Sequence, residues 1–351
     1  MRLTPRYLGS ILVLAGLYLI AAKLGLSLAF SVKQITTVWP PSGLALAALI
    51  LYGFDLWPGI FLGALLANLL TSAPLPVAAG IAVGNTLEAV LGTYLLRRVI
   101  HFRPALNRVR GVIGLAFLAA FFSTMVAATI GTISLSLGGL LATTSAPTAW
   151  VLWWFGDMAG VLLFAPVILV WRNGWRQINH QNFAEFGSLL VGTAVVAAAI
   201  FFGQFTFLGN HPQVSYFIFP FIIWAAFRFK QLGVTAVSII TSIIAILGTA
   251  SGEGPFAGAG SSEQQLITLL VYIILLSASG LFMAVAVLQR EASEQQLLRQ
   301  TKELKAARNK ILQELNDKKE RESHLQESNE RITGILARLM DETPERSSRE
   351  L

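Results

Sequence analysis

The sequence predicts an all-α protein in which a polytopic bundle of transmembrane helices is followed by a cytoplasmic coiled-coil helix. Hydrophobic residues make up 54% of the 351 residues and charged residues 13%, about half the charged fraction of a typical soluble domain. Apolar stretches long enough to cross a bilayer continue up to residue 289, and from residue 290 Glu, Gln, Lys and Arg dominate. We therefore expect a membrane domain at 1–289, a coiled-coil helix at 290–340 and a flexible tail at 341–351.

The net charge of +7 belongs entirely to the membrane part of the chain. Residues 1–289 contain 13 Lys and Arg against 6 Asp and Glu, whereas residues 290–351 contain 13 of each. In a membrane domain such basic residues set the topology, so nucleic acid is not an expected partner. The chain has no cysteine, which excludes disulfides and thiolate metal sites.

A bilayer requires about 20 mainly apolar residues per helix, and this rule predicts ten spans. They lie near residues 8–30, 36–53, 57–75, 77–96, 111–136, 149–171, 185–206, 214–228, 232–249 and 265–289. The number falls to eight if the third and fourth spans, or the eighth and ninth, are re-entrant. With either number, the lipid bilayer is an expected partner.

Basic residues are concentrated in alternate connections between these spans. Eleven of the thirteen lie on one side: Arg2, Arg6, Arg97, Arg98, Arg103, Arg108, Arg110, Arg172, Arg176, Arg228 and Lys230. On the other side the first connection contains Lys33, and the remaining connections contain no Lys or Arg. The positive-inside rule then places both termini in the cytoplasm.

Two Trp-Pro pairs, Trp39-Pro40 and Trp57-Pro58, open apolar runs. Proline is tolerated in the first turn of a helix, where its missing N–H costs little, so each pair predicts a helix start. Trp at such a position is typical of a membrane–water interface. Ser42, two residues after Pro40, is an intramembrane polar group that either lines a cavity or bonds a neighbouring helix.

Two carboxyl groups fall inside predicted spans, Glu88 in the fourth and Asp157 in the sixth. Charged groups in hydrocarbon are costly, so they usually face the bundle interior and mark a function. Asn85 shares a helix face with Glu88 at i, i+3, and Trp153 shares one with Asp157 at i, i+4. The alternative is a structural role for each carboxyl, protonated or paired with a Trp N–H. The candidate ligand-binding or signalling residues are Trp39, Ser42, Asn68, Asn85, Glu88, Trp153, Trp154 and Asp157.

No catalytic or metal site is expected. The four histidines, His101, His180, His211 and His324, have no ligand spacing. The sequence contains no phosphate-binding Gly-x-x-x-x-Gly-Lys, no nucleophile elbow and no His-Glu-x-x-His. We therefore do not expect an enzyme, and any cofactor is unknown.

After residue 290 one apolar stripe recurs every seven residues. Its members are Leu297, Leu304, Ile311, Leu325, Ile332 and Leu339, with Lys318 as the one break. Such a repeat favours a parallel dimeric coiled coil, although the partner positions four residues on are weakly apolar. The alternative is a single solvated helix.

Several short motifs occur in a fixed order along about residues 5–290: Val38–Gly43; Trp57-Pro58-Gly59 with Gly63 and Asn68; Gly84-Asn85-Thr86 with Glu88; Gly131-Thr132; Trp154 with Gly156-Asp157 and Gly160; Pro166; Phe227-Arg228-Phe229; Gly254-Pro255-Phe256. In order and spacing they resemble the bacterial membrane-associated sensor domain family known as MASE, type one. The resemblance implies an input module of the bacterial inner membrane, commonly fused to histidine kinase, diguanylate cyclase, phosphodiesterase or PAS domains. It implies no established ligand.

Two functions from different classes remain open. The first is a sensory input module, as in two-component systems, that passes a signal through the coiled coil as a homodimer. The sequence stops after the charged helix, so we expect the output domain to lie outside this sequence or to be a separate cytoplasmic signalling partner. The second is a secondary transporter or channel with the carboxyl groups in the substrate or proton path.

Overall fold

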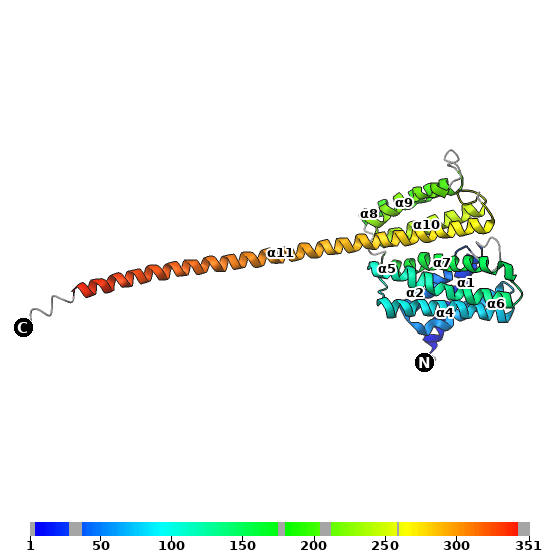
Figure 1. Cartoon of the computed structure of the whole chain (residues 1–351), viewed down its shortest axis with the longest axis horizontal. Coiled ribbons are helices and arrows are strands. Elements are labelled where there is room, and N and C mark those ends of the chain that lie inside the picture. Colours follow the sequence, from blue (N-terminus) through cyan, green and yellow to red (C-terminus); the bar gives the residue numbers. More distant parts are fainter. Residues whose placement is uncertain (1–3, 28–36, 175–179, 204–211, 258–259, 343–351) are drawn as a thin grey trace, which may run out of the picture. The chain divides into compact units, whose positions relative to one another are not determined.

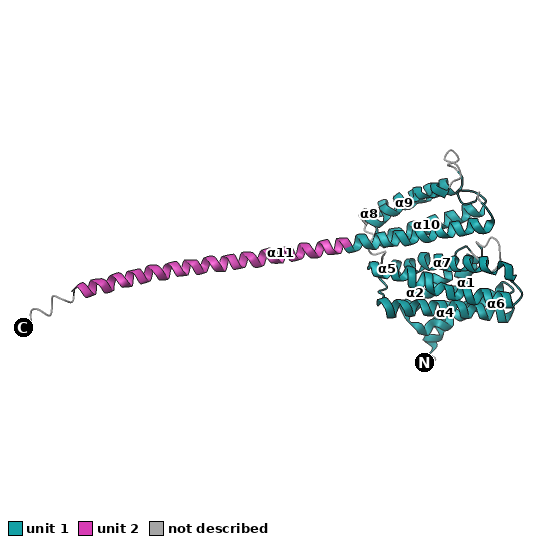
Figure 2. Ribbon diagram, viewed as in Figure 1, with its two compact units in different colours: residues 1–289 teal, residues 290–351 magenta. Residues whose placement is uncertain are grey.

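The computed structural model describes residues 4–27, 37–174, 180–203, 212–257 and 260–342. Within these residues the regular elements are all helical and no strand occurs (Figure 1). The chain divides into two compact units, Met1–Gln289 and Arg290–Leu351 (Figure 2). Seven of the described helices are long and apolar enough to cross a membrane. The chain is therefore an all-helical, multi-pass membrane protein.

Helices α1 (Pro5–Ser27) and α3 (Trp57–Leu70) run parallel in close contact. A Cβ atom on Gly59 would lie 2.8 Å from the carbonyl oxygen of Ile11, and one on Gly63 would lie 2.7 Å from Tyr18 Cβ. Both positions therefore require glycine. In lipid, where packing replaces the hydrophobic drive, such small residues allow helices to associate.

Helix α2 (Pro40–Tyr52) begins where the sequence predicts, with its two prolines in the first turn and Trp39 as the N-cap. It runs antiparallel to α1. Its first residue, Pro40, lies against Gly25 near the end of α1. At the other end, Tyr7 Oη donates a hydrogen bond of 2.9 Å to the carbonyl oxygen of Asp55, in the short 3₁₀ helix η1 (Phe54–Leu56) that follows α2. The segment from Pro40 to Asp55 therefore accompanies α1 along most of its length.

Helix α4 (Leu75–Ile100) packs antiparallel to a continuous helical segment formed by α5, η2 and α6. The bounds are α5 Val109–Gly114, η2 Leu115–Ser123, which is π-helical, and α6 Thr124–Leu137. Gly84 on α4 faces Ala127, and Gly92 faces Ser123. After η3 (Thr143–Ser145), α7 (Ala146–Gly174) returns along α6 and also packs against α2.

The last helices of the membrane unit are α8 (His180–Phe201), η6 (Pro212–Ile218), α9 (Phe219–Arg228) and α10 (Lys230–Ala250). Helix α11 (Ser262–Glu342) is continuous and contributes its first part to this unit. There Gly280 packs against Ile222 and Val234, and Tyr272 Oη donates a hydrogen bond of 3.3 Å to the carbonyl oxygen of Ser215.

The predicted basic connections meet at one end of the membrane unit. Gln231 Nε2, at the start of α10, donates a hydrogen bond of 3.0 Å to the carbonyl oxygen of Leu106 between α4 and α5. The backbone N–H of Val109 donates to Gln289 Oε1 at 3.4 Å. The connections after α3 (71–74), after α6 (138–142) and after α10 (251–257) contain no Lys or Arg. Arg2, Lys33 and Arg176 lie outside the described residues.

The prediction of ten spans is supported only in part. Each of the ten stretches contains a helix, but α2, α3 and α9 have 13, 14 and 10 residues, fewer than the seven long helices. Their apolar runs continue into turns that proline or a left-handed glycine imposes; for example, Gly53 ends α2 with a φ of 105°. Hydropathy counts those turn residues as part of the span, so ten spans stay a prediction.

Candidate functional site

The site is organised by the close approach of α2 to α7. The backbone N–H of Trp39 donates a hydrogen bond of 3.0 Å to the carbonyl oxygen of Gly156. A Cβ atom on Gly160 would collide with the carbonyl group of Trp39, and one on Gly43 would lie 2.8 Å from the backbone nitrogen of Ala165. The start of α2 therefore lies directly on the backbone of α7, because both helices carry glycine at the contact.

This contact places Ser42 at the point where the two intramembrane carboxyl groups meet. Glu88 on α4 and Asp157 on α7 are 3% and 0% exposed, and each interacts electrostatically with the other. Ser42 lies beside both carboxyl groups, and Trp153 lies beside Asp157. None of the ion pairs among the described residues involves Glu88 or Asp157. The structure therefore brings together two acids without a basic partner.

Tyr18, in the middle of α1, completes the cluster and was not among the residues predicted from the sequence. It is 1% exposed, and its Oη accepts a hydrogen bond of 2.9 Å from Asn85 Nδ2. It also interacts with Trp39 and with both carboxyl groups. The available signal was a hydroxyl group in the middle of the predicted span at 8–30. Four helices, α1, α2, α4 and α7, thus contribute one polar side chain or more.

A small cavity of about 20 Å³ lies beside this cluster. It is lined by Leu26, Trp39, Ala67, Asn68, Thr71, Ile81, Asn85, Trp153, Gly156 and Asp157. One water molecule needs roughly 10–15 Å³ of such volume, whereas sites for small organic ligands span about 300–1,000 Å³. The cavity therefore accommodates a water molecule and excludes an organic ligand in this conformation.

Five buried polar atoms of the cluster have no hydrogen-bond partner among the described residues. They are Trp39 Nε1, Asn85 Oδ1, Glu88 Oε2, Asp157 Oδ1 and Asp157 Oδ2. Buried polar groups are normally paired, and leaving one unpaired costs about 1–3 kcal/mol. Such a concentration of unpaired atoms around one water-sized cavity is typical of a site that takes up a small polar species.

Not every predicted residue belongs to this cluster. Trp154 points to a different side of α7, where its Nε1 donates a hydrogen bond of 2.9 Å to the carbonyl oxygen of Phe121 in η2. Successive residues of a helix are about 100° apart, so Trp153 and Trp154 cannot share a face. Asn68 lines the cavity, but its Nδ2 donates to the carbonyl oxygen of Ala64 at 2.9 Å, in its own helix.

A larger cavity of about 690 Å³ lies between α1, α2 and α7 and shares no lining residue with the first. Its walls include Val13, Leu17 and Leu44. Arg172 also lines it, at the end of the membrane unit where the basic connections lie. Val13 and Leu17 belong to the exposed apolar face of α1. In a membrane this face contacts lipid, so we attribute the cavity to the protein–lipid boundary and not to the carboxyl cluster.

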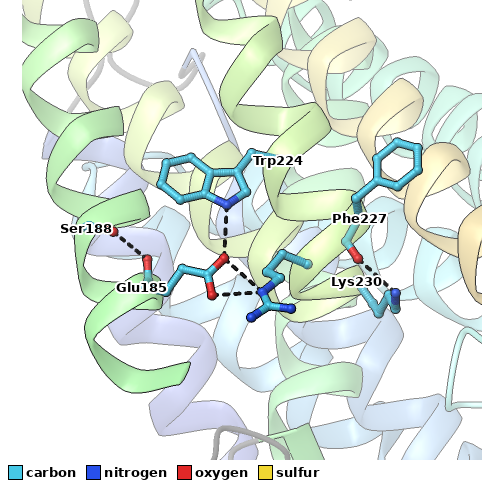
Figure 3. A network of polar contacts seen from close by, with 6 residues as sticks. Glu185, Ser188, Trp224, Phe227 and Lys230 are labelled. Atoms are coloured by element: carbon cyan, nitrogen blue, oxygen red, sulfur yellow. Dashed lines mark hydrogen bonds and ion pairs between the residues drawn. The ribbon is translucent and has the colours of Figure 1, made fainter. Parts of the chain in front are cut away.

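A separate polar network joins α8, α9 and the start of α10 (Figure 3). Glu185 forms an ion pair of 2.8 Å with Arg228 and accepts a hydrogen bond of 3.3 Å from Trp224 Nε1. Lys230 Nζ donates to the carbonyl oxygen of Phe227 at 2.8 Å. The Arg228 and Glu185 side chains are 54% and 30% exposed, so this network ties helix ends together at the surface.

The six residues of the predicted apolar stripe all lie on the second part of α11. They are Leu297, Leu304, Ile311, Leu325, Ile332 and Leu339, and they are 52–71% exposed. The stripe is therefore an apolar face on a water-exposed helix, and dimerisation through it stays a prediction.

A family model, MASE1, matches residues 11–291, which is nearly the whole membrane unit and the first two residues beyond it. No match was found among the curated proteins or the solved structures.

Proposed function

The chain belongs to the MASE1 family of membrane-associated sensor domains, and we propose that it is an inner-membrane input module that passes a signal through a dimeric α11 to a cytoplasmic partner. The observation that carries this proposal is the continuity of α11. One helix, Ser262–Glu342, contains both the packed segment of the membrane unit and the exposed apolar stripe.

Continuity gives this helix a mechanical role. Between Gly280 and Gly334 the sequence of α11 contains neither Gly nor Pro, the residues that most often bend a helix. A shift or rotation of its packed segment is therefore carried along the helix to the stripe. Because the partner positions of the stripe are weakly apolar, two registers of a dimer can lie within a few kcal/mol of each other, which suits a two-state switch.

The charge distribution supports the proposed orientation. The basic residues of the connections lie at the end of the membrane unit where Gln289 is also found. By the positive-inside rule this end faces the cytoplasm, and so do both termini. An even number of crossings, such as ten, places both termini on the same side of the membrane. Because α2 runs along most of α1, we expect this short helix also to cross the membrane.

Disulfide cross-linking in native membranes tests dimerisation. The chain has no cysteine, so a single introduced cysteine reports one position without background. We expect Leu304→Cys and Ile311→Cys to form cross-linked dimers on oxidation, because an apolar stripe faces its partner in a coiled coil. Asn309→Cys, on the opposite side of the helix, is the matched control. Equal yields at all three positions would exclude a coil built on this stripe.

Transmission is tested by adding Asp157→Asn to the Leu304→Cys and Ile311→Cys chains. If the membrane unit biases α11, the relative cross-linking yields of the two positions change. Glu253→Gln, which removes an exposed carboxyl group of the same unit, is the control background. If the relative cross-linking yields of the two positions are identical in both backgrounds, the carboxyl cluster does not influence α11.

The transporter alternative rests on the same carboxyl pair, since intramembrane acids often mark an ion path. Its test is flux of protons or of small solutes in proteoliposomes. Flux that disappears in Glu88→Gln would favour transport over signalling. The water-sized cavity offers no passage for an organic substrate in this conformation.

A further inference from the structure

The unpaired polar atoms of the carboxyl cluster indicate what kind of species the cluster can bind. Four of them are acceptors: Asn85 Oδ1, Glu88 Oε2 and both oxygens of Asp157. One is a donor, Trp39 Nε1. Among these five atoms the donors are therefore three fewer than the acceptors.

One water molecule and one proton remove this deficit. A water in the cavity of about 20 Å³ accepts from Trp39 Nε1 and donates to two acceptors, Asn85 Oδ1 and one oxygen of Asp157. A proton on the other Asp157 oxygen makes that oxygen a donor to Glu88 Oε2. Every unpaired atom then has a partner, and the negative charge of the pair falls from two to one.

We propose that the cluster of Glu88, Asp157, Ser42, Asn85, Tyr18 and Trp39 is a binding site for a proton, held together with one ordered water. Two neighbouring carboxylates in hydrocarbon, without a cation, repel each other and lose their hydration. The pair with one proton bound is therefore much lower in free energy than the pair with none. The single remaining charge lies beside the N-terminal turn of α2, whose dipole stabilises it.

No Lys or Arg of the described residues lines the cavity beside the pair. Tyr18 on α1 is the other titratable group that interacts with it. Among the described residues, α2, α3 and α6 contain no charged side chain, and α10 contributes none to the cavity lining. Proton uptake therefore changes the charge at the point where α2 meets α7, which is the contact formed by Gly43 and Gly160.

The cavity also indicates the side from which the proton arrives. Its lining extends to Leu26 near the end of α1 and to Thr71 just after α3. Both positions lie at the end of the unit opposite the basic connections. By the proposed orientation this is the outer side, so the site takes its proton from outside the cytoplasm. The assignment of side rests on the proposed function, whereas proton binding itself does not.

Infrared spectroscopy of the full chain in lipid nanodiscs tests the proposal. A protonated carboxyl group has a C=O stretching band that a carboxylate lacks. In the pH range in which exposed carboxyl groups are ionised, we expect the wild type to show such a band, which disappears as the pH rises further, and the double variant Glu88→Gln, Asp157→Asn to lack it. Each single variant should shift the midpoint of the titration, because the remaining acid no longer has an acidic neighbour. Glu253→Gln should leave band and midpoint unchanged.

Three results would overturn the proposal. The first is absence of the band in the wild type at a pH at which exposed carboxyl groups are ionised, which needs no variant and does not depend on folding of a mutant. The second is a band that persists unchanged in the double variant. The third is loss of the band on replacing potassium by sodium at constant pH and ionic strength, which would make the site one for a metal cation. None of these readouts involves α11, so they are independent of the cross-linking tests of signalling.

Discussion

The two units of this chain expose apolar side chains to a similar degree but to different surroundings. In the membrane unit Leu12 on α1 is 68% exposed, and in the second unit Leu304 on α11 is 71% exposed. Leu12 lies in a span of 23 residues that is apolar enough to cross a membrane. Leu304 lies in a segment rich in Lys, Glu and Gln.

The same exposed fraction therefore has opposite consequences. Lipid tails are as apolar as leucine, so Leu12 gains little from a protein partner. In water, each Å² of apolar surface that becomes buried contributes about 25 cal/mol, so a second copy of α11 stabilises the stripe around Leu304. Inside the membrane unit, stability depends instead on close backbone packing and on paired polar groups. The predictions below test this contrast.

The largest expected effect is at the α2–α7 contact. Gly160→Ala places a Cβ against the carbonyl group of Trp39, and such overpacking should lower the stability of the membrane unit by about 2–3 kcal/mol. Gly334→Ala is the matched control in the second unit, where nothing lies within 4 Å. It should be neutral or stabilising by about 0.5–1 kcal/mol. Thermal unfolding in detergent measures both, and equal midpoints would contradict the contrast.

The second effect concerns association and not folding. Leu304→Asp combined with Leu325→Asp should weaken the dimer at least about 100-fold, because two charges then enter the apolar seam. The unfolding midpoint of the membrane unit should not change. Mass photometry over a concentration series measures the dimer, and Lys302→Asp, which changes the net charge by the same two units outside the stripe, controls for added charge. A dimer that survives the leucine substitutions must be held by the membrane unit.

A third, smaller effect is at the end of α2. Arg97 Nη2 donates hydrogen bonds of 3.0 and 2.9 Å to the carbonyl oxygens of Leu49 and Ile50, and its guanidinium lies 5.2 Å from the Phe54 ring centroid. Arg97→Gln should cost about 1–2 kcal/mol in unfolding experiments, since these bonds satisfy the last carbonyls of a short helix. The exposed neighbour Arg98→Gln should have no measurable effect. Equal behaviour of the two variants would show that α2 needs no cap from α4.

The smallest effect is expected at the surface ion pair of Figure 3. Glu185→Gln removes the pair with Arg228, but exposed pairs are screened by water and salt. The unfolding midpoint should stay within experimental error of the wild type at physiological salt. Ser188→Ala, on the neighbouring turn of α8, is the control. A clear loss of stability confined to Glu185→Gln would show that this end of the membrane unit is less solvated than its exposure indicates.

The sequence by itself determined the helical class, the membrane part and the change at residue 290, because hydropathy and charge are local properties of a segment. It also determined the start of α2 at Pro40, since proline restricts its own backbone, and it picked out Glu88 and Asp157, since acids in apolar spans are costly. The spacing rule placed Trp153 beside Asp157 because both lie on one helix.

The tertiary structure alone decided which helices meet. Helical spacing relates residues within one helix, but it does not bring Glu88 on α4 to Asp157 on α7 or add Tyr18 from α1. That meeting depends on the approach of α2 to α7 through Gly43 and Gly160, a long-range packing result. The same packing turned Trp154 towards η2 and left a cavity with room for one water. Close packing of several helices is a property of all of them together, so no single segment of sequence contains it.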